Sequence, residues 1–104
     1  MCGATEGGLS LEGIDVAREA IIQGQVLRAG DGEGDREPVS GAYVRLLDAS
    51  GEFTAEVPTS ATGHFRFFAG DGAWTLRALA PKAEVAERKV FARTGEVAEV
   101  ALTV

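Results

Sequence analysis

Hydrophobic and polar residues alternate with a period of two along most of the chain from position 22 onward. This period is typical of a strand with one buried face, because successive side chains of a strand point to opposite sides of a sheet. The pattern predicts strands over residues 22–27, 42–47, 53–57, 64–68, 74–78, 85–91 and 97–104, separated by turns rich in Gly, Pro, Ser and Asp. About seven short strands with almost no helical pattern indicate an all-β fold, a single antiparallel β-sandwich.

Two further expectations concern the middle of the chain. The Gly70–Gly72 turn predicts that the strands over 64–68 and 74–78 pair as a hairpin. The single tryptophan, Trp74, begins the second of these strands. Because the indole side chain buries a large apolar area, we expect the core to centre on Trp74.

The N-terminal third of the chain has a less regular pattern. The acidic, glycine-rich stretch Gly30–Pro38 has the composition of a loop and is expected to connect two strands. Asp15–Ile21 contains good helix formers, but the β-branched pair Ile21–Ile22 favours an extended lead into the first strand. We therefore expect residues 1–18 to form a flexible N-terminal segment and residues 19–104 to form the sandwich domain.

The net charge and the residue types limit the classes of function. The 104 residues include 10 Lys and Arg against 16 Asp and Glu, which gives a formal net charge of -6. Such a surface repels phosphate backbones and anionic lipid, so we expect binding to neither nucleic acid nor a membrane. With one histidine and no nucleophile-elbow motif around its serines, the sequence offers no Ser-His-Asp triad, and we expect no enzyme activity.

The cysteine content and the first residues bear on the cellular compartment. Cys2 is the only cysteine, so no disulfide forms within the chain. Residues 1–8 contain no basic and apolar leader, and the longest apolar runs are far shorter than the ~20 residues that span a bilayer. These features favour the reducing cytoplasm and predict no membrane segment.

Metal chemistry has little support in the residue pattern. His64 is the only histidine, and alternation places its ring on the outer face of its strand, where it could contact solvent or a ligand. A histidine without a second strong ligand seldom holds zinc. The acidic stretch lacks the glycine and glutamate of a calcium-binding EF-hand loop, because Arg36 and Ala42 occupy those positions. We expect no metal site and no cofactor.

Four outward side chains are candidates for a protein-binding face. They are Tyr43, Arg45, Arg66 and Arg77. The alternation allows them to line one face of a sheet, and aromatic and arginine side chains are favoured at interfaces. The alternative is a structural role, in which the arginines pair across strands with carboxylates such as Glu56 and Glu99.

Several segments of the chain resemble a known superfamily. The segments Ile22–Val26, Pro38–Leu46, Thr62–Phe67 and Gly72–Ala78 are similar to the carboxypeptidase regulatory-like, or transthyretin-like, β-sandwich. A closer resemblance, to the SseC family of small actinobacterial proteins of unknown function, rests on Arg45–Asp48, Glu52–Val57, Phe65–Phe68 and Trp74–Leu79. It covers residues 20–104 and the Met1–Cys2 start.

The resemblance implies an association with sulfur metabolism and no particular activity. Our leading hypothesis is a non-enzymatic accessory or adaptor protein of sulfur metabolism. Genes of that family tend to lie beside genes for thiosulfate sulfurtransferases, and the leading hypothesis takes such a sulfurtransferase as the binding partner. Two other hypotheses stay open. Cys2 could act as a persulfide acceptor in a sulfur carrier, or the edge strands could pair in a homo-oligomer, because exposed sheet edges favour self-association.

Cys2 is the candidate for sulfur chemistry. Removal of Met1 would leave an α-amino group beside the thiol, and a thiol near a flexible terminus could reach the active site of a partner. A thiolate could there accept a sulfane sulfur. The alternative is an incidental thiol, since residues 3–8 contain no cation that would stabilise a thiolate.

The carrier hypothesis predicts a change in the mass of the protein. After incubation with thiosulfate and a thiosulfate sulfurtransferase, the intact chain should gain one sulfur atom, and a thiol reductant should remove it. The Cys2→Ser variant should gain nothing. If the wild-type chain gains no sulfur in intact-mass spectrometry, Cys2 is an incidental thiol.

Overall fold

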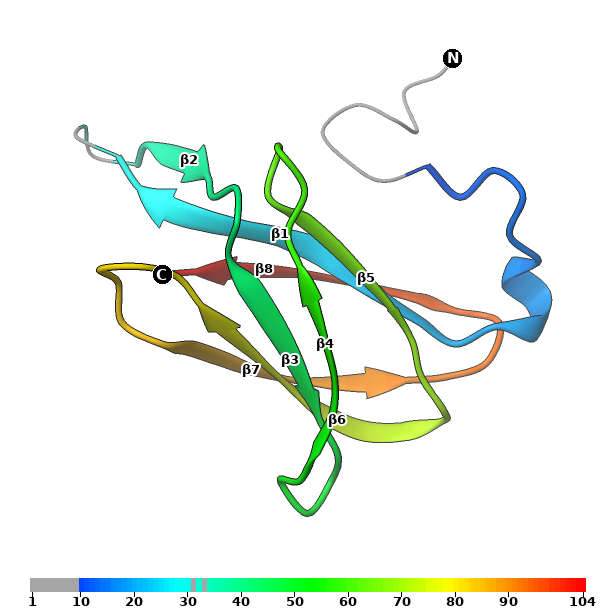
Figure 1. Ribbon diagram of the computed structural model, residues 1–104. Coiled ribbons are helices and arrows are strands. Elements are labelled where there is room, and N and C mark those ends of the chain that lie inside the picture. The colour runs from blue at the N-terminus through cyan, green and yellow to red at the C-terminus, as the bar shows by residue number, and fades with distance from the viewer. Residues whose placement is uncertain (1–9, 31, 33) are drawn as a thin grey trace.

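The computed structural model of the protein describes residues 10–30, 32 and 34–104 (Figure 1). In this part of the chain, eight strands and one short 3-10 helix form a two-layered sandwich. The elements are η2 (Val16–Arg18), β1 (Ile21–Ala29), β2 (Arg36–Pro38), β3 (Tyr43–Leu47), β4 (Phe53–Pro58), β5 (His64–Phe68), β6 (Gly72–Leu79), β7 (Ala86–Ala92) and β8 (Val97–Thr103). Within the same residues, no helix has the length and hydropathy needed to cross a bilayer.

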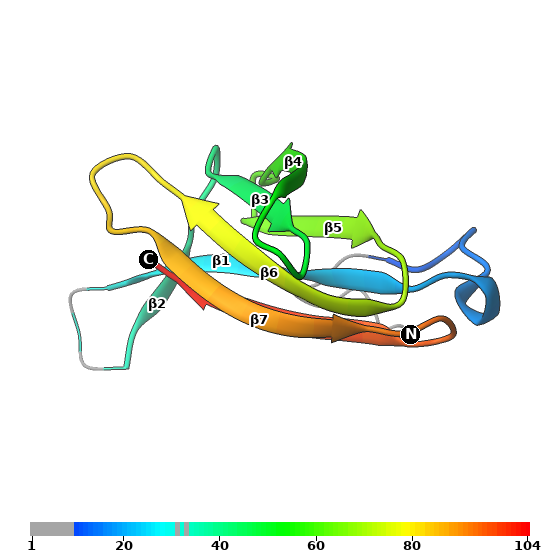
Figure 2. The ribbon, with the colours of Figure 1, turned by 90° about the horizontal axis from the view of Figure 1, so that it is seen from below.

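The strands form two four-stranded sheets. In the first, which we call sheet A, β1 lies between β5 and β8, and β2 pairs with the far end of β1. In the second, sheet B, the order is β4-β3-β6-β7 and all pairs are antiparallel. Figure 2 shows β8 following β7 along one side of the molecule, where the two sheets approach each other. The all-β sandwich expected from the sequence is confirmed.

The core lies between the inner faces of the two sheets. Sheet A contributes Ile22, Val26 and Phe65, while sheet B contributes Val44 and Leu76. All five side chains are at most 2% exposed. They occupy alternate positions of their strands, as the period of two in the sequence predicts.

The first and last strands pair in parallel, which the antiparallel expectation did not include. The register of β1 and β8 runs from Ile21 opposite Val97 to Leu27 opposite Thr103. Within this pair, a Cβ atom on Gly24 would lie only 1.6 Å from the carbonyl oxygen of Val100. Gly24 therefore permits a close approach of the two backbones that no other residue would allow.

The expected hairpin between the strands over 64–68 and 74–78 is wrong. β5 pairs with β1 in sheet A, whereas β6 pairs with β3 and β7 in sheet B. The Gly70–Gly72 turn carries the chain from one sheet to the other. A short glycine-rich turn is compatible with either geometry, so its sequence cannot show whether the flanking strands pair or face each other.

Trp74 is not the centre of the core. It is only partly buried and packs against the margin of the core cluster. Its indole nitrogen donates a hydrogen bond to the carbonyl oxygen of Gly70, with 2.8 Å between the two atoms. A buried indole N–H needs an acceptor. Here the acceptor is Gly70, in the connection between the two sheets, and this bond keeps the Trp74 ring at the margin of the core.

Two segments of the N-terminal third also differ from expectation. Part of the Gly30–Pro38 stretch is a strand, since β2 pairs with β1 from Leu27 opposite Pro38 to Ala29 opposite Arg36. Its proline fits there because β2 is an edge strand. The segment before β1 is not fully extended, because η2 forms one turn over Val16–Arg18 before Glu19 becomes extended.

Two aspartates, the half-buried Asp48 and the exposed Asp71, stabilise turns by accepting several hydrogen bonds. Oδ1 of Asp71 accepts bonds from the Thr94 hydroxyl and backbone N–H, at 2.6 and 2.7 Å, and so ties the β5–β6 turn to the β7–β8 turn. Oδ1 of Asp48 accepts bonds from Ser50 and from the backbone of Glu52. These donors favour the carboxylate, and the pKa of each aspartate lies below its ordinary value, led by the Thr94 and Ser50 hydroxyls respectively.

The close approach at Gly24 predicts a large cost for a single methyl group. We expect Gly24→Ala to lower the free energy of unfolding by about 3 kcal/mol or more, because the rigid Val100 backbone must move. Gly70→Ala is the matched control, since nothing lies within 4 Å of its added Cβ, and it should change stability by about 1 kcal/mol at most. Urea denaturation followed by Trp74 fluorescence measures both. Equal costs would contradict the close approach.

The Asp71 bonds predict a pH-dependent contribution to stability. Because the folded pKa of Asp71 is lowered, its contribution is fully present above pH 3.8 and is lost as the pH falls through the folded pKa. Asp71→Asn should therefore lower the melting temperature at pH 7, and the difference from wild type should shrink below pH 3.8. Thermal unfolding at several pH values tests this. A difference that stays constant down to strong acid would show that the charge plays no part.

Candidate functional site

A row of charged side chains crosses the outer face of sheet B. Glu56, Arg45, Arg77 and Glu87 lie opposite one another on β4, β3, β6 and β7, and we call them the charge row. Nε of Arg45 donates to Glu56 at 2.7 Å, and Nε of Arg77 donates to Glu87 at 2.5 Å. Each carboxylate thus neutralises one of two adjacent arginines, which would otherwise repel each other.

Three exposed aromatic rings flank the charge row on the same face. Tyr43, Phe53 and Phe91 are 50%, 61% and 58% exposed. The guanidinium of Arg45 lies 6.0 Å from the centre of the Phe53 ring, and that of Arg93 lies 5.6 Å from the Phe91 ring. We call these rings and the charge row together the sheet B face. Aromatic and arginine side chains are enriched at protein interfaces, so this face is a candidate for binding.

Phe53 reaches this face through a β-bulge. Val57 and Ala55 of β4 lie opposite Val44 and Leu46 and face the core, but the register then shifts, and Phe53 lies opposite Leu47. Two residues of β4 oppose one residue of β3 at this point, so the alternation reverses. The sequence pattern places Phe53 on the same side as Ala55, and the bulge turns it outward.

The outer face of sheet A carries a different polar arrangement. Nε of Arg66 donates to the side-chain oxygen of Gln23 at 2.7 Å, and the amide nitrogen of Gln23 donates to Glu99 at 2.8 Å. The amide thus links the arginine of β5 to the carboxylate of β8 across β1. Arg66 also donates from its Nη2 atom to the carbonyl oxygen of Ser10 at 2.6 Å, so the segment before β1 lies over this sheet.

His64 is buried, which corrects the expectation of an exposed ring. Its residue is 7% exposed, and its Nδ1 atom lies 2.7 Å from the hydroxyl oxygen of Thr62. The preceding turn folds back onto β5, because Ser60 bonds both Thr62 and the backbone N–H of His64. Alternation gives the side of the strand on which a residue lies, but it does not show whether a turn covers that side.

The structure brings only part of the predicted binding face together. Tyr43, Arg45 and Arg77 lie on the sheet B face, with Arg45 directly opposite Arg77. Arg66 does not belong to it, since β5 is in sheet A, and this error follows from the expected hairpin. The cross-strand pairing expected as the alternative is present for Arg45 with Glu56. Cys2, the candidate sulfur acceptor, lies outside the described residues.

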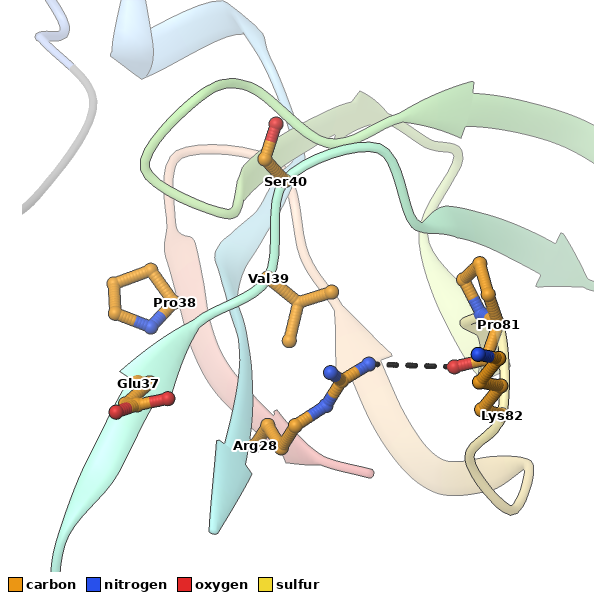
Figure 3. Close-up of a pocket in the computed structure, with 7 residues that line it drawn as sticks. All are labelled: Arg28, Glu37, Pro38, Val39, Ser40, Pro81 and Lys82. Carbon is orange, nitrogen blue, oxygen red and sulfur yellow. Dashed lines mark hydrogen bonds between the residues drawn. The ribbon is translucent and has the colours of Figure 1, made fainter. Parts of the chain in front are cut away.

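The sequence did not predict a hollow near the C-terminal end of β1. It lies between β1, β2 and the β6–β7 loop and has a volume of about 420 Å³ (Figure 3). Its charged lining consists of Arg28, Glu37 and Lys82. In Figure 3, the Arg28 side chain extends from β1 toward the β6–β7 loop, where Nη2 donates to the carbonyl oxygen of Pro81 at 3.3 Å. These residues are far apart in the sequence and form no motif, so only the fold joins them.

Solved structures with the same sandwich architecture are distant in sequence. The minor pilin GBS52 of Streptococcus agalactiae superimposes with a TM-score of 0.68 and 13% identity over 85% of this chain and 44% of that chain. A DUF3823 family protein of Parabacteroides merdae has a TM-score of 0.62 and 18% identity over 85% of this chain and 46% of that chain. The chain thus spans less than half of either protein. Pseudomonas aeruginosa PA1324 has a TM-score of 0.61 and 13% identity over 86% and 91% of the two chains. At these identities the likeness supports the β-sandwich fold alone.

Mycobacterial relatives are much closer in sequence. The uncharacterized Mycobacterium tuberculosis proteins Rv0814c and Rv3118 are each 54% identical over 80 residues, which cover 76% of this chain and 75% of theirs. An uncharacterized protein of Mycolicibacterium smegmatis is 58% identical over 67 residues, 64% of this chain and 69% of its own. A model of the family described as a protein of unknown function, DUF1416, matches residues 2–104. With nearly the whole chain matched, this protein belongs to the DUF1416 family.

Proposed function

We propose that the protein is a non-enzymatic docking module that binds a thiosulfate sulfurtransferase through the sheet B face. The observation that carries the docking role is the exposure of Tyr43, Phe53 and Phe91 around the charge row. The identity of the partner comes from the sequence resemblance to a family whose genes accompany sulfurtransferase genes. In this proposal the protein acts in the cytoplasm and contributes binding rather than chemistry.

The energetics of the sheet B face favour a binding role over a structural one. The Arg45–Glu56 and Arg77–Glu87 pairs are partly exposed to solvent, and such pairs stabilise a fold by about 0–1 kcal/mol each. An exposed aromatic ring adds little to the stability of the free protein. Truncation of an aromatic hot-spot residue at an interface lowers the binding free energy by about 2 kcal/mol or more. The face therefore contributes little to folding and could contribute strongly to a complex.

The two outer faces differ in a way that supports the choice of sheet B. On sheet A, the outward residues Ile21, Gln23 and His64 are all buried, at 0%, 4% and 7% exposure. A partner could not reach these central positions. On sheet B, the outward residues include three exposed rings, so a flat partner surface could contact the face directly.

The proposal predicts that the two sheet faces respond differently to the same substitution. Phe91→Ala should weaken the complex with the sulfurtransferase at least tenfold, that is by about 1.4 kcal/mol or more. The matched control is Phe68→Ala, which removes an equally exposed ring, 55% against 58%, from the outer face of sheet A. Isothermal titration calorimetry with the purified full chain measures both affinities.

The same titration distinguishes the proposal from its alternatives. Arg77→Glu should weaken the complex, because a third carboxylate would join Glu56 and Glu87 in the charge row. Failure of the wild-type chain to bind the enzyme would exclude this partner. If Phe68→Ala or Arg66→Glu weakens the complex while Phe91→Ala leaves it intact, sheet A carries the interface. Light scattering that gives twice the monomer mass, together with loss of the dimer in Phe91→Ala, would assign the face to self-association.

A further inference from the structure

The hollow between β1, β2 and the β6–β7 loop combines two cations with apolar walls. Arg28 extends from β1 toward the β6–β7 loop, and Lys82 lies in that loop next to Pro81 (Figure 3). Pro38, Val39 and Pro81 supply the apolar surface, and Ser40 adds a hydroxyl. A volume of about 420 Å³ falls in the range of pockets that hold small molecules.

Neither cation of the hollow forms an ion pair within the part of the chain that the structure describes. The three ion pairs found among the described residues involve Arg18, Arg45 and Arg77, and none involves Arg28 or Lys82. Glu37 lies directly opposite Arg28 in the β1–β2 register, yet no ion pair joins them. In Figure 3 the Arg28 guanidinium extends toward Pro81 instead. Seven of the ten Lys and Arg side chains form no ion pair with another described residue, and two of them, Arg28 and Lys82, line the same hollow.

The backbone at Lys82 is also unusual. Its φ of 59° lies in the left-handed region, and it is the one residue other than glycine with a positive φ in the part of the chain that the structure describes. Glycine, Asn and Asp adopt this conformation far more readily than lysine. Such a conformation costs free energy, and strained positions of this kind cluster at binding sites.

We propose that this hollow binds a small organic carboxylate. The two cations and Glu37 leave one net positive charge, which matches a carboxylate better than a doubly charged phosphate or sulfate. The Arg28 guanidinium offers N–H donors beyond the one that bonds Pro81, in the planar arrangement that suits a carboxylate. The walls formed by Pro38, Val39 and Pro81 suit an apolar body attached to the acid group. This site lies outside the sheet B face and does not depend on the docking role.

A nuclear magnetic resonance titration tests the site. Sodium phenylacetate is added to the 15N-labelled full chain at constant ionic strength, with phenylacetamide as the uncharged control and sodium sulfate as the dianion. Phenylacetate should shift the backbone amide signals of Arg28, Val39, Ser40 and Lys82 with a saturating curve and a millimolar Kd. Phenylacetamide and sulfate should bind at least tenfold more weakly.

Two variants and a matched control connect the binding to the named cations. Arg28→Gln and Lys82→Gln should each raise the Kd for phenylacetate at least fivefold. Lys89→Gln removes the chain's other lysine, which lies on β7 outside the hollow, and should leave the Kd unchanged. The spectra themselves report whether each variant is folded, and both cationic residues are exposed, so both variants should fold.

Three results would overturn the proposal. The first is the absence of saturating shifts at these amides up to ~50 mM phenylacetate, well above a millimolar Kd. The second is equal binding of phenylacetamide, which would show an apolar contact without recognition of the acid. The third is an effect of Lys89→Gln as large as that of Lys82→Gln, which would indicate attraction to overall positive charge.

Discussion

The structure depends on the first residues of β1, which are buried on both faces of the strand. Ile21 and Ile22 are consecutive residues that point to opposite sides of sheet A, and both are 0% exposed. A shift of β1 by one residue would move the polar side chain of Gln23 from the outer face into the core position of Ile22, so the register is strongly fixed. β5 and β8 take their positions from hydrogen bonds to this strand, and sheet B packs on the inner side of the sheet they form.

The burial of β1 also makes the two outer faces unequal. On sheet A, the buried amide of Gln23 is satisfied on both sides by Arg66 and Glu99, so this arrangement holds three strands together. On sheet B, each arginine of the charge row pairs with a carboxylate on an outer strand near solvent. Buried polar groups with full hydrogen bonding specify a structure, whereas exposed ion pairs can exchange their partners at low cost. Arginine and glutamate thus hold neighbouring strands together on the outer face of sheet A, whereas on the outer face of sheet B their ion pairs contribute little to the fold.

The extent to which the sequence predicted the structure follows from what alternation encodes. A period of two identifies strands and separates their two sides, and the structure has the apolar Ile22, Val44 and Leu76 in the core and Arg45 on an outer face. The period carries no information on which strands are neighbours, because pairing is set by contacts distant in the sequence. The Gly70–Gly72 turn was therefore interpreted as a hairpin, and Arg66 was assigned to the wrong face.

The features missed in the candidate sites have local physical causes. A β-bulge reversed the direction of Phe53, and no residue type marks that bulge in the sequence. The hollow joins Arg28 and Lys82, which are separated by more than half of the chain. The β2 strand was hidden in a stretch with loop composition, because its three exposed residues show neither alternation nor an apolar run.

The two sides of the sandwich are not equivalent, because Arg88 joins the two sheets on the side of β7 and β8. Arg88 lies on β7, opposite the core residue Leu76 of β6. Its Nη1 atom donates a hydrogen bond to the carbonyl oxygen of Ala101 on β8, with 3.3 Å between the two atoms. The guanidinium thus fastens the edge of one sheet to the edge of the other, and it occupies an acceptor that an incoming strand would otherwise use. The two sheets are thus joined along β7 and β8. On heating, they should begin to separate on the opposite side, along β4 and β5, where backbone amides would exchange with solvent first.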